Sequence, residues 1–354
     1  MKKKLLISTI FILLTLPFMV SAEHVMYVVT GPDNKLQIIN TQSDEIIGEI
    51  GELENAHGLS GNANTEYLVA GSMKQGNQKI ASLKPKTVTD EEHKEHHVAA
   101  KDKPILAGEM SGKSYVSIVH PKHGHVMRRI EVRGITHHTS VSPNGKIAIA
   151  VHSQNGGISV INLDQSKVVA FVKTGQVPNY AVFNSRGNSL YVSNAGSGNV
   201  SVIDTDKWVV TSNIKVGMGP EHMYLDSHDE VLYVVNVIEG SVSVVNLADT
   251  KNVRKIKVGK SPHGISLSSD GLRLFVSNKG GNSLTRINID SGKVANILLS
   301  PAPYHLEVIP NTNKVYVSSR KSPKIWVIDQ NSLAILKEIN IKSGVAHQMV
   351  VLDR

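Results

Sequence analysis

Histidine recurs at one position along this chain, close behind a proline, in a pattern that could serve metal chemistry. The stretches that show it most plainly are Pro220-Glu221-His222, Pro262-His263 and Pro303-Tyr304-His305. A neutral imidazole nitrogen is a good ligand for Zn²⁺, Cu²⁺ and similar ions. Imidazoles held at equivalent positions of a repeated fold could therefore converge on one ion.

Aligning the remaining repeats on the same position extends the set, and only the repeat with Asn179 and Tyr180 lacks a histidine there. We predict that these residues, named the axial histidines, are metal ligands: His57, His137, His138, His222, His263, His305 and His347. With 16 histidines in 354 residues, about a tenth of the repeats would carry one at two allowed positions by chance. Two structural explanations stay open, namely duplication of a structural histidine and imidazoles that satisfy backbone groups at a strand start.

The chain has no cysteine, so the ligand set would be imidazole alone. Such a site favours copper or zinc, and copper has the higher intrinsic affinity. Axial ligation of a haem and anion binding by protonated imidazoles are the alternatives. His137 and His138 are adjacent, so in an extended strand only one of them is expected to face the shared site.

A second group, the local histidines, lies in two short tracts, "EEHKEHH" and "VHPKHGHV". Its members are His93, His96, His97, His120, His123 and His125. Short histidine-rich tracts suggest metal capture, and a solvated polar loop is the alternative. Glu221 and Glu307 flank axial histidines and are candidate second-shell partners or bases. No nucleotide-binding, serine-hydrolase or zinc-protease motif is present, so no catalytic residue is predicted.

The elements that would position the axial histidines are short strands in a repeat of about 42 residues. Each unit has four alternating runs separated by Gly, Asn or Asp turns, which is typical of antiparallel strands. Seven such units run from about residue 25 to 354. Four-stranded units of this period predict an all-β, seven-bladed β-propeller whose C-terminal strand closes the first blade. The axial histidines would then ring one mouth of its central channel.

The second unit carries an insertion at about 74–113 that includes the tract "TDEEHKEHH". Insertions in a repeat usually form loops on one face, often the binding face. The remaining chain, 23–354, is expected to form a single propeller domain around this His-rich loop.

The chain begins with "MKKKLLISTIFILLTLPFMVSAEH", which has the basic, apolar and small-residue regions of a secretory signal. We predict that residues 1–22 are cleaved and that the product is periplasmic, with no membrane span after processing. Losing three lysines takes the formal charge from +8 to +5. That modest, dispersed charge, without a long basic run, argues against nucleic-acid binding.

Three runs resemble the YVTN signature of YVTN-type seven-bladed β-propellers: Tyr191-Val192-Ser193-Asn194, Tyr233-Val234-Val235-Asn236 and Phe275-Val276-Ser277-Asn278. That resemblance implies the propeller fold over nearly the whole mature chain. Related propellers include haem-binding nitrite reductases and a periplasmic zinc metallochaperone. Nitrous-oxide reductases also hold a copper–sulfide cluster with seven histidines in a seven-bladed propeller. This chain is similar to them only in the number of these histidines and in the propeller architecture.

The function predicted from these features is metal handling or delivery by a periplasmic protein that binds copper or zinc, with a periplasmic protein as a further candidate partner. A copper- or haem-dependent oxidoreductase or haem-maturation protein is one alternative. A protein-interaction scaffold with structural histidines is another.

Overall fold

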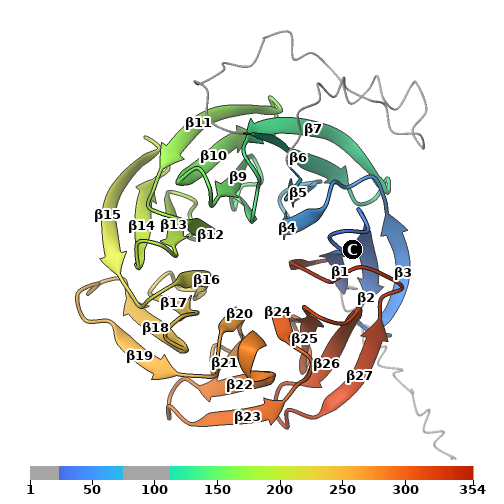
Figure 1. Cartoon of the computed structure of the whole chain (residues 1–354), viewed down its shortest axis with the longest axis vertical. Helices are drawn as coiled ribbons and strands as arrows, with labels where there is room; N and C mark the ends of the chain where they lie inside the picture. The colour runs from blue at the N-terminus through green and yellow to red at the C-terminus, as the bar shows by residue number, and fades with distance from the viewer. Residues whose placement is uncertain (1–23, 75–111, 354) are drawn as a thin grey trace, which may run out of the picture.

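The computed structural model describes residues 24–74 and 112–353. In this part of the chain, 28 strands form seven four-stranded antiparallel sheets, arranged as blades around a central axis (Figure 1). This arrangement confirms the predicted all-β, seven-bladed propeller. The insertion predicted at 74–113 falls between β5 and β6, and its residues 75–111, with His93, His96 and His97, lie outside the described residues.

The blades are lettered A to G along the chain, and each is given from its innermost to its outermost strand. Blades A to C comprise β28 (Met349–Asp353), β1 (His24–Val29), β2 (Leu36–Asn40) and β3 (Glu45–Ile50); β4 (Ala56–Ser60), β5 (Leu68–Ser72), β6 (Lys113–His120) and β7 (His125–Arg133); and β8 (Thr139–Val141), β9 (Ile147–His152), β10 (Gly157–Asn162) and β11 (Lys167–Lys173). Blades D and E comprise β12 (Pro178–Phe183), β13 (Ser189–Asn194), β14 (Asn199–Asp204) and β15 (Val209–Lys215); and β16 (Pro220–Leu225), β17 (Val231–Asn236), β18 (Ser241–Asn246) and β19 (Arg254–Lys257). Blades F and G comprise β20 (Pro262–Leu267), β21 (Arg273–Asn278), β22 (Ser283–Asn288) and β23 (Val294–Leu298), with the 3₁₀ turn η1 (Lys279–Gly281); and β24 (Pro303–Val308), β25 (Lys314–Ser319), β26 (Lys324–Asp329) and β27 (Ile335–Asn340).

Blade A is built from both ends of the described chain. β28 pairs antiparallel with β1, from His24 opposite Asp353 to Val28 opposite Met349. This pairing confirms that the C-terminal strand closes the first blade. It also covers the inner edge of β1, which would otherwise expose unpaired backbone groups.

The core of the propeller lies between the blades. The buried hydrophobic residues of the described chain form seven clusters, and each cluster joins two adjacent blades. The second strand of a blade is therefore buried on both faces, as in β13 and β17, whereas the outermost β15 is largely exposed. Period-2 alternation is visible in the outer strands because only one of their faces meets a neighbouring blade.

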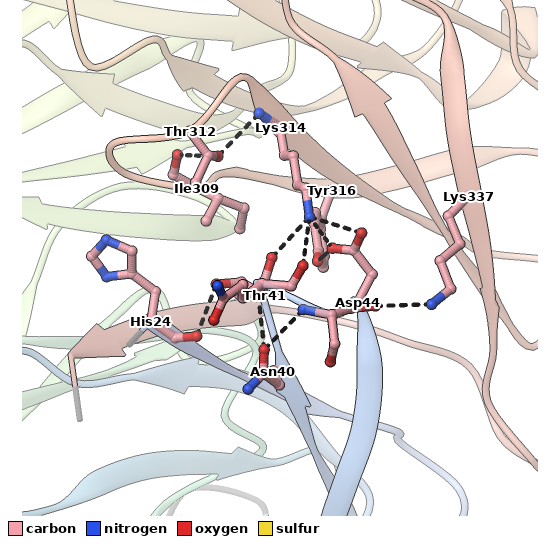
Figure 2. Close-up of polar contacts among 11 residues, drawn as sticks. His24, Asn40, Thr41, Asp44, Ile309, Thr312, Lys314, Tyr316 and Lys337 are labelled. Carbon is pink, nitrogen blue, oxygen red and sulfur yellow. Dashed lines mark hydrogen bonds and ion pairs between the residues drawn. The ribbon is translucent and has the colours of Figure 1, made fainter. Parts of the chain in front are cut away.

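A polar clamp joins blade A to blade G, the last blade before closure (Figure 2). Lys314 Nζ lies 2.7 Å from Asp44 Oδ1 and donates to the Thr41 carbonyl at 3.0 Å. The Tyr316 hydroxyl donates to the same Asp44 carboxylate. Asp44 and Lys314 are mostly buried, with side chains 12% and 21% exposed. The clamp therefore ties the β2–β3 turn to the start of β25.

Replacing Asp44 by asparagine should lower the free energy of unfolding by about 1–3 kcal/mol, because Lys314 would lose its charged partner in a mostly buried site. Glu49→Gln is a matched control, since it neutralises an exposed carboxylate on the same hairpin, 2.8 Å from Lys35 Nζ. Exposed pairs contribute about 0–1 kcal/mol. Urea denaturation of both variants measures the difference, and equal losses would contradict a stabilising clamp.

Candidate metal centre

The axial histidines of blades B, E, F and G lie in β-bulges at the start of the innermost strand. In blade E the register runs from Pro220 opposite Asn236 to Met223 opposite Val234, so β16 has one residue more than its partner. The same irregularity occurs around His57, His263 and His305. A bulge bends the strand and redirects its side chains. It therefore explains how residues on different strands can turn toward one axis.

In blades F and G, the serine of the YVTN-like signature stabilises the bulge. Ser277 Oγ accepts a hydrogen bond from the Gly264 amide at 2.8 Å, one residue after His263. Ser318 Oγ accepts one from the His305 amide at 3.1 Å. A bulge leaves a backbone group without its ladder partner, and the hydroxyl supplies one. In these two blades the signature serine is thus linked physically to the position of the histidine.

Two glycines allow neighbouring inner strands to approach one another. A Cβ atom on Gly58 would lie 2.7 Å from His138 Cα. A Cβ atom on Gly264 would lie 2.6 Å from the Tyr304 carbonyl oxygen and 3.1 Å from His305 Cα. No side chain fits at these distances, so glycine is needed where adjacent blades bring their histidines together.

The axial histidines form one contiguous group that includes residues from six of the seven blades. Distances between imidazole centroids are His347–His57 4.3 Å, His57–His138 5.0 Å, His138–His222 4.6 Å, His222–His263 4.3 Å, His263–His305 5.0 Å and His305–His57 5.5 Å. In two triads, His57–His138–His305 and His222–His263–His305, the candidate ligand nitrogens all lie within 4.8 Å of one another. His305 belongs to both triads.

Several imidazole nitrogens in this group are buried without a hydrogen-bond partner among the described residues. They are His138 Nε2, both nitrogens of His222, His263 Nε2, His305 Nε2 and His347 Nδ1. Most buried polar side-chain atoms in proteins have a partner. So many orphaned nitrogens in one place therefore point to a ligand that the imidazoles would share.

The Nδ1 atoms of three axial histidines are held by acceptors. The acceptor is the Glu221 carboxylate for His263 at 2.9 Å and the Asn179 carbonyl for His138 at 2.8 Å. His57 Nδ1 lies 3.1 Å from the carbonyl oxygen of His137. Because these oxygens can only accept, the proton of each neutral imidazole lies on Nδ1 and its lone pair lies on Nε2. Acceptors that hydrogen-bond the non-ligating nitrogen of a metal-bound histidine fix its tautomer and orientation in this way.

Burial keeps the axial histidines neutral. It is the main cause that lowers the pKa of five of them well below the usual value: His57, His138, His222, His263 and His305. Burial also lowers the pKa of His347 to about 3 and lowers that of His137. An imidazole must be deprotonated to ligate a metal ion. The metal-binding form is therefore the one present at neutral pH.

His137 and His138 both contact the other axial histidines. The His137 ring stacks on His57 with centroids 4.5 Å apart, and its Nδ1 lies 2.8 Å from His138 Nδ1. This differs from the expectation that only one of the pair would face the site. The reason is local, because β8 begins only at Thr139 and the two histidines precede the strand.

Blade D contributes a tyrosine where the other blades contribute histidine. The Tyr180 ring lies 4.7 Å from His222 and 5.1 Å from His138, between centroids. Gln348 Nε2 lies 3.4 Å from the Tyr180 hydroxyl. Tyr180 therefore takes, between His138 and His222, the place of the histidine that blade D lacks.

The two acidic candidates have different surroundings. Glu221 accepts the hydrogen bond from His263 described above and is 22% exposed. Glu307 lies two residues after His305 on β24, and burial raises its pKa to about 8. Its field contributes to raising the pKa of Tyr180 and Tyr224. Glu307 is thus a neutral acid near these tyrosines at neutral pH.

Sequence reasoning gave no role to Tyr304. Its ring stacks on His263 with centroids 4.0 Å apart and an interplanar angle of 8°. Its hydroxyl lies 3.2 Å from His57 Nε2. Tyr304 thus connects two axial histidines that lie in different triads. The register of the inner strands places Asn179, Glu221 and His263 at the same position in blades D, E and F. No recurring tyrosine marks this position, so only the packing identifies Tyr304.

The local histidines described by the structure lie away from the axial group. His120 and His125 face each other across the β6–β7 turn, and the His120 and His123 centroids are 4.1 Å apart. Ser72 at the end of β5 pairs with Ala56 beside His57, whereas Leu68 at its start pairs with Val119. The β6–β7 turn is therefore at the opposite end of blade B. Among the described residues, only axial histidines form groups whose ligand atoms lie within 4.8 Å.

The axial histidines differ sharply from His152, which replaces the signature asparagine in blade C. His152 Nε2 lies 2.8 Å from Ser159 Oγ and Nδ1 lies 3.1 Å from the Ile135 carbonyl oxygen. Asn194 makes the equivalent bond to Ser201 Oγ at 2.9 Å. His152 is thus a structural substitute whose two nitrogens are both satisfied.

That contrast predicts opposite effects of leucine in the metal-free protein. His222→Leu should raise the free energy of unfolding by about 1–2 kcal/mol, because it removes two unpartnered buried nitrogens. His152→Leu should lower it by about 2–3 kcal/mol, because Ser159 and the Ile135 carbonyl would lose their partners. Urea denaturation measures both. A loss of stability in His222→Leu equal to that in His152→Leu would mean that the axial histidines are structural.

The sequence matches the model of the YNCE-like beta-propeller family over residues 86–354, and the chain belongs to that family. No curated protein matches it. A functionally unknown protein from Desulfotomaculum acetoxidans is similar in structure, with 13% identity, coverage of 93% of this chain and 99% of that one, and a TM-score of 0.70. The periplasmic gluconolactonase of Pseudomonas aeruginosa has 15% identity, coverage of 93% and 98%, and a TM-score of 0.69. A dihydro-heme d1 dehydrogenase has 14% identity, coverage of 93% and 67%, and a TM-score of 0.62. At these identities the likeness shows the fold alone.

Within the described ranges, none of the helices has the length and apolar character needed to cross a membrane.

Proposed function

We propose that this protein binds a divalent transition-metal ion, copper or zinc, through its axial histidines, and that it handles or delivers that metal in the periplasm. The observation that carries the proposal is the convergence of buried imidazole nitrogens that have no other partner. A structural role would leave such nitrogens hydrogen-bonded, as in His152. Each orphaned nitrogen costs free energy in the metal-free protein, and an ion would offset that cost.

The chemistry of the donors favours a metal ion over the alternative ligands. An anion held by imidazolium groups is disfavoured because burial lowers the histidine pKa values. A porphyrin would have to separate imidazoles whose centroids are 4.3–5.0 Å apart, or lie above them. A single ion needs only three or four of these nitrogens within about 2.0–2.1 Å of it. All-imidazole coordination suits copper and zinc, with copper higher in intrinsic affinity.

The local histidines enter the proposal as a separate capture site. Because His120, His123 and His125 lie at the far end of blade B, transfer to the axial histidines would have to involve other residues. His93, His96 and His97 belong to the insertion that follows β5, whose end pairs with Ala56 beside His57. Deleting residues 75–111 tests this part, and unchanged loading of the axial site would argue against capture by the insertion.

The decisive experiment is metal analysis of protein isolated without a histidine tag, combined with an absorption spectrum. We expect about one or more equivalents of copper or zinc in the wild type. The triple variant His138→Ala/His263→Ala/His305→Ala should lose it, because it removes ligands from both triads. His228→Ala is the matched control, since this histidine is exposed and lies in the β16–β17 turn, beyond the end of β16 opposite to His222. Absence of metal, both as isolated and after reconstitution, would refute the proposal.

A further inference from the structure

Two cationic side chains lie over Tyr304 at the mouth that carries the axial histidines. Lys279 Nζ is 5.3 Å and Arg320 Cζ is 5.5 Å from the centre of the Tyr304 ring. Tyr304 in turn stacks on His263 and contacts His57. Both cations are thus one aromatic ring away from the axial histidines.

Their placement follows from the repeat. Each cation comes directly after the second strand of its blade, Lys279 after β21 and Arg320 after β25. The other blades carry Gly31, Met73, Ser153, Ala195 and Val237 there. Basic residues therefore occupy this position only in the adjacent blades F and G, on either side of Tyr304.

Neither cation is neutralised by an ion pair within residues 24–74 and 112–353, where lysines such as Lys255 and Lys324 do have carboxylate partners. Among the residues that the structure describes, Glu221 is the one carboxylate bound to an axial histidine. With a divalent ion among neutral imidazoles, the ion, Lys279, Arg320 and Glu221 would together carry a formal charge of about +3.

We propose that Lys279 and Arg320 form a subsite for an oxyanion, a carboxylate or a phosphate group, that completes the coordination of the metal held by the axial histidines. The proposal rests on the proposed function. A guanidinium and an ammonium are the side chains that bind such oxygens most strongly. The metal would then enter or leave as an anionic chelate, and the aromatic ring of Tyr304 would keep the two cations above the imidazoles.

The test uses Cu²⁺-loaded protein, because the visible and EPR spectra of the ion report a new oxygen ligand. Acetate and inorganic phosphate are titrated separately, and this distinguishes a carboxylate from a phosphate ligand. Lys279→Gln/Arg320→Gln should weaken binding of the preferred anion about tenfold or more while the copper content stays unchanged. Lys260→Gln/Lys321→Gln is the control, since it removes the same charge from exposed positions in loops at the same mouth.

The outcomes separate the two proposals. Equal anion affinity in the test and control variants, or no spectral response to either anion in copper-loaded wild type, would overturn the subsite. Failure of the wild type to take up copper would overturn the proposed function instead. In that case phosphate and acetate are titrated calorimetrically into metal-free protein. Binding that is lost only in Lys279→Gln/Arg320→Gln would support an oxyanion site at these two residues but overturn its role in metal coordination, and absence of binding would refute the site itself.

Discussion

Replacing His305 by alanine should weaken copper or zinc binding about 100- to 1000-fold, more than any other single axial substitution. His305 is the member shared by the two triads, and its Nε2 has no partner among the described residues. Structural zinc sites bind with about 10–16 kcal/mol through four ligands, or roughly 2.5–4 kcal/mol per ligand. That figure corresponds to about two to three orders of magnitude in affinity.

Competition with a chromophoric chelator measures this loss, and His228→Ala again serves as the control. Comparing His57→Ala with His263→Ala locates the ion, because each residue belongs to one triad only. A large loss in one of them and a small loss in the other would assign a single ion to that triad. An affinity for His305→Ala within threefold of wild type would contradict a site centred on the shared histidine.

Metal-free protein should become progressively less stable as the pH falls below about 6.5. Histidines with folded-state pKa values below the unfolded value of about 6.5 bind protons more readily when the chain unfolds. Their contribution to stability is fully present above pH 6.5 and is lost as the pH falls below it. For His347, with a folded pKa of about 3, the loss continues down to that pH. Each histidine that stays neutral contributes a slope of about 1.4 kcal/mol per pH unit.

The sum over the axial histidines makes this effect large. Burial lowers the pKa of six of them strongly, so their effects on the pH dependence of stability add in the same direction. Glu307 acts in the opposite sense, because its folded pKa of about 8 makes it destabilising as the pH rises from about 4.5. One carboxyl group opposes six imidazoles, so the histidines decide the sign below pH 6.5.

Urea denaturation at a series of pH values tests this prediction. Saturating Zn²⁺ should move the acid transition to lower pH, since metal at about 100 times its Kd adds about 2.7 kcal/mol. His222→Leu should make the slope shallower by about 1.4 kcal/mol per pH unit. A slope that is the same in His222→Leu and wild type would show that this imidazole titrates normally in the folded protein.

The fold could be predicted from the sequence because the residues that define it recur at a regular spacing. Three features predict the seven blades and their closure: the repeat of about 42 residues, the signature at Tyr191–Asn194 and the single strand that is left over at the C-terminus after the last complete repeat. The positions of the axial histidines followed from the same alignment. In each of these cases, the residue that matters recurs at a constant spacing.

The parts that could not be predicted depend on contacts between blades. Nothing in the sequence indicates that His222 lies in a bulge, or that His137 and His138 precede the strand instead of alternating along it. Tyr304 and Lys279 occur once each at their repeat positions, and their importance comes from the packing of blade G against blade F. Single residues that act across a blade interface leave no periodic signal.

The closing strand also has a consequence for biosynthesis. His347 lies two residues before β28, and Gln348 accepts a hydrogen bond from the Leu59 amide at 2.9 Å, beside the His57 bulge. The last segment of the described chain to be translated therefore supplies an axial histidine and supports a second one. A nascent or truncated chain that stops after β27 lacks both contributions. Tight metal binding would then be expected only of molecules that contain β28 and have closed blade A.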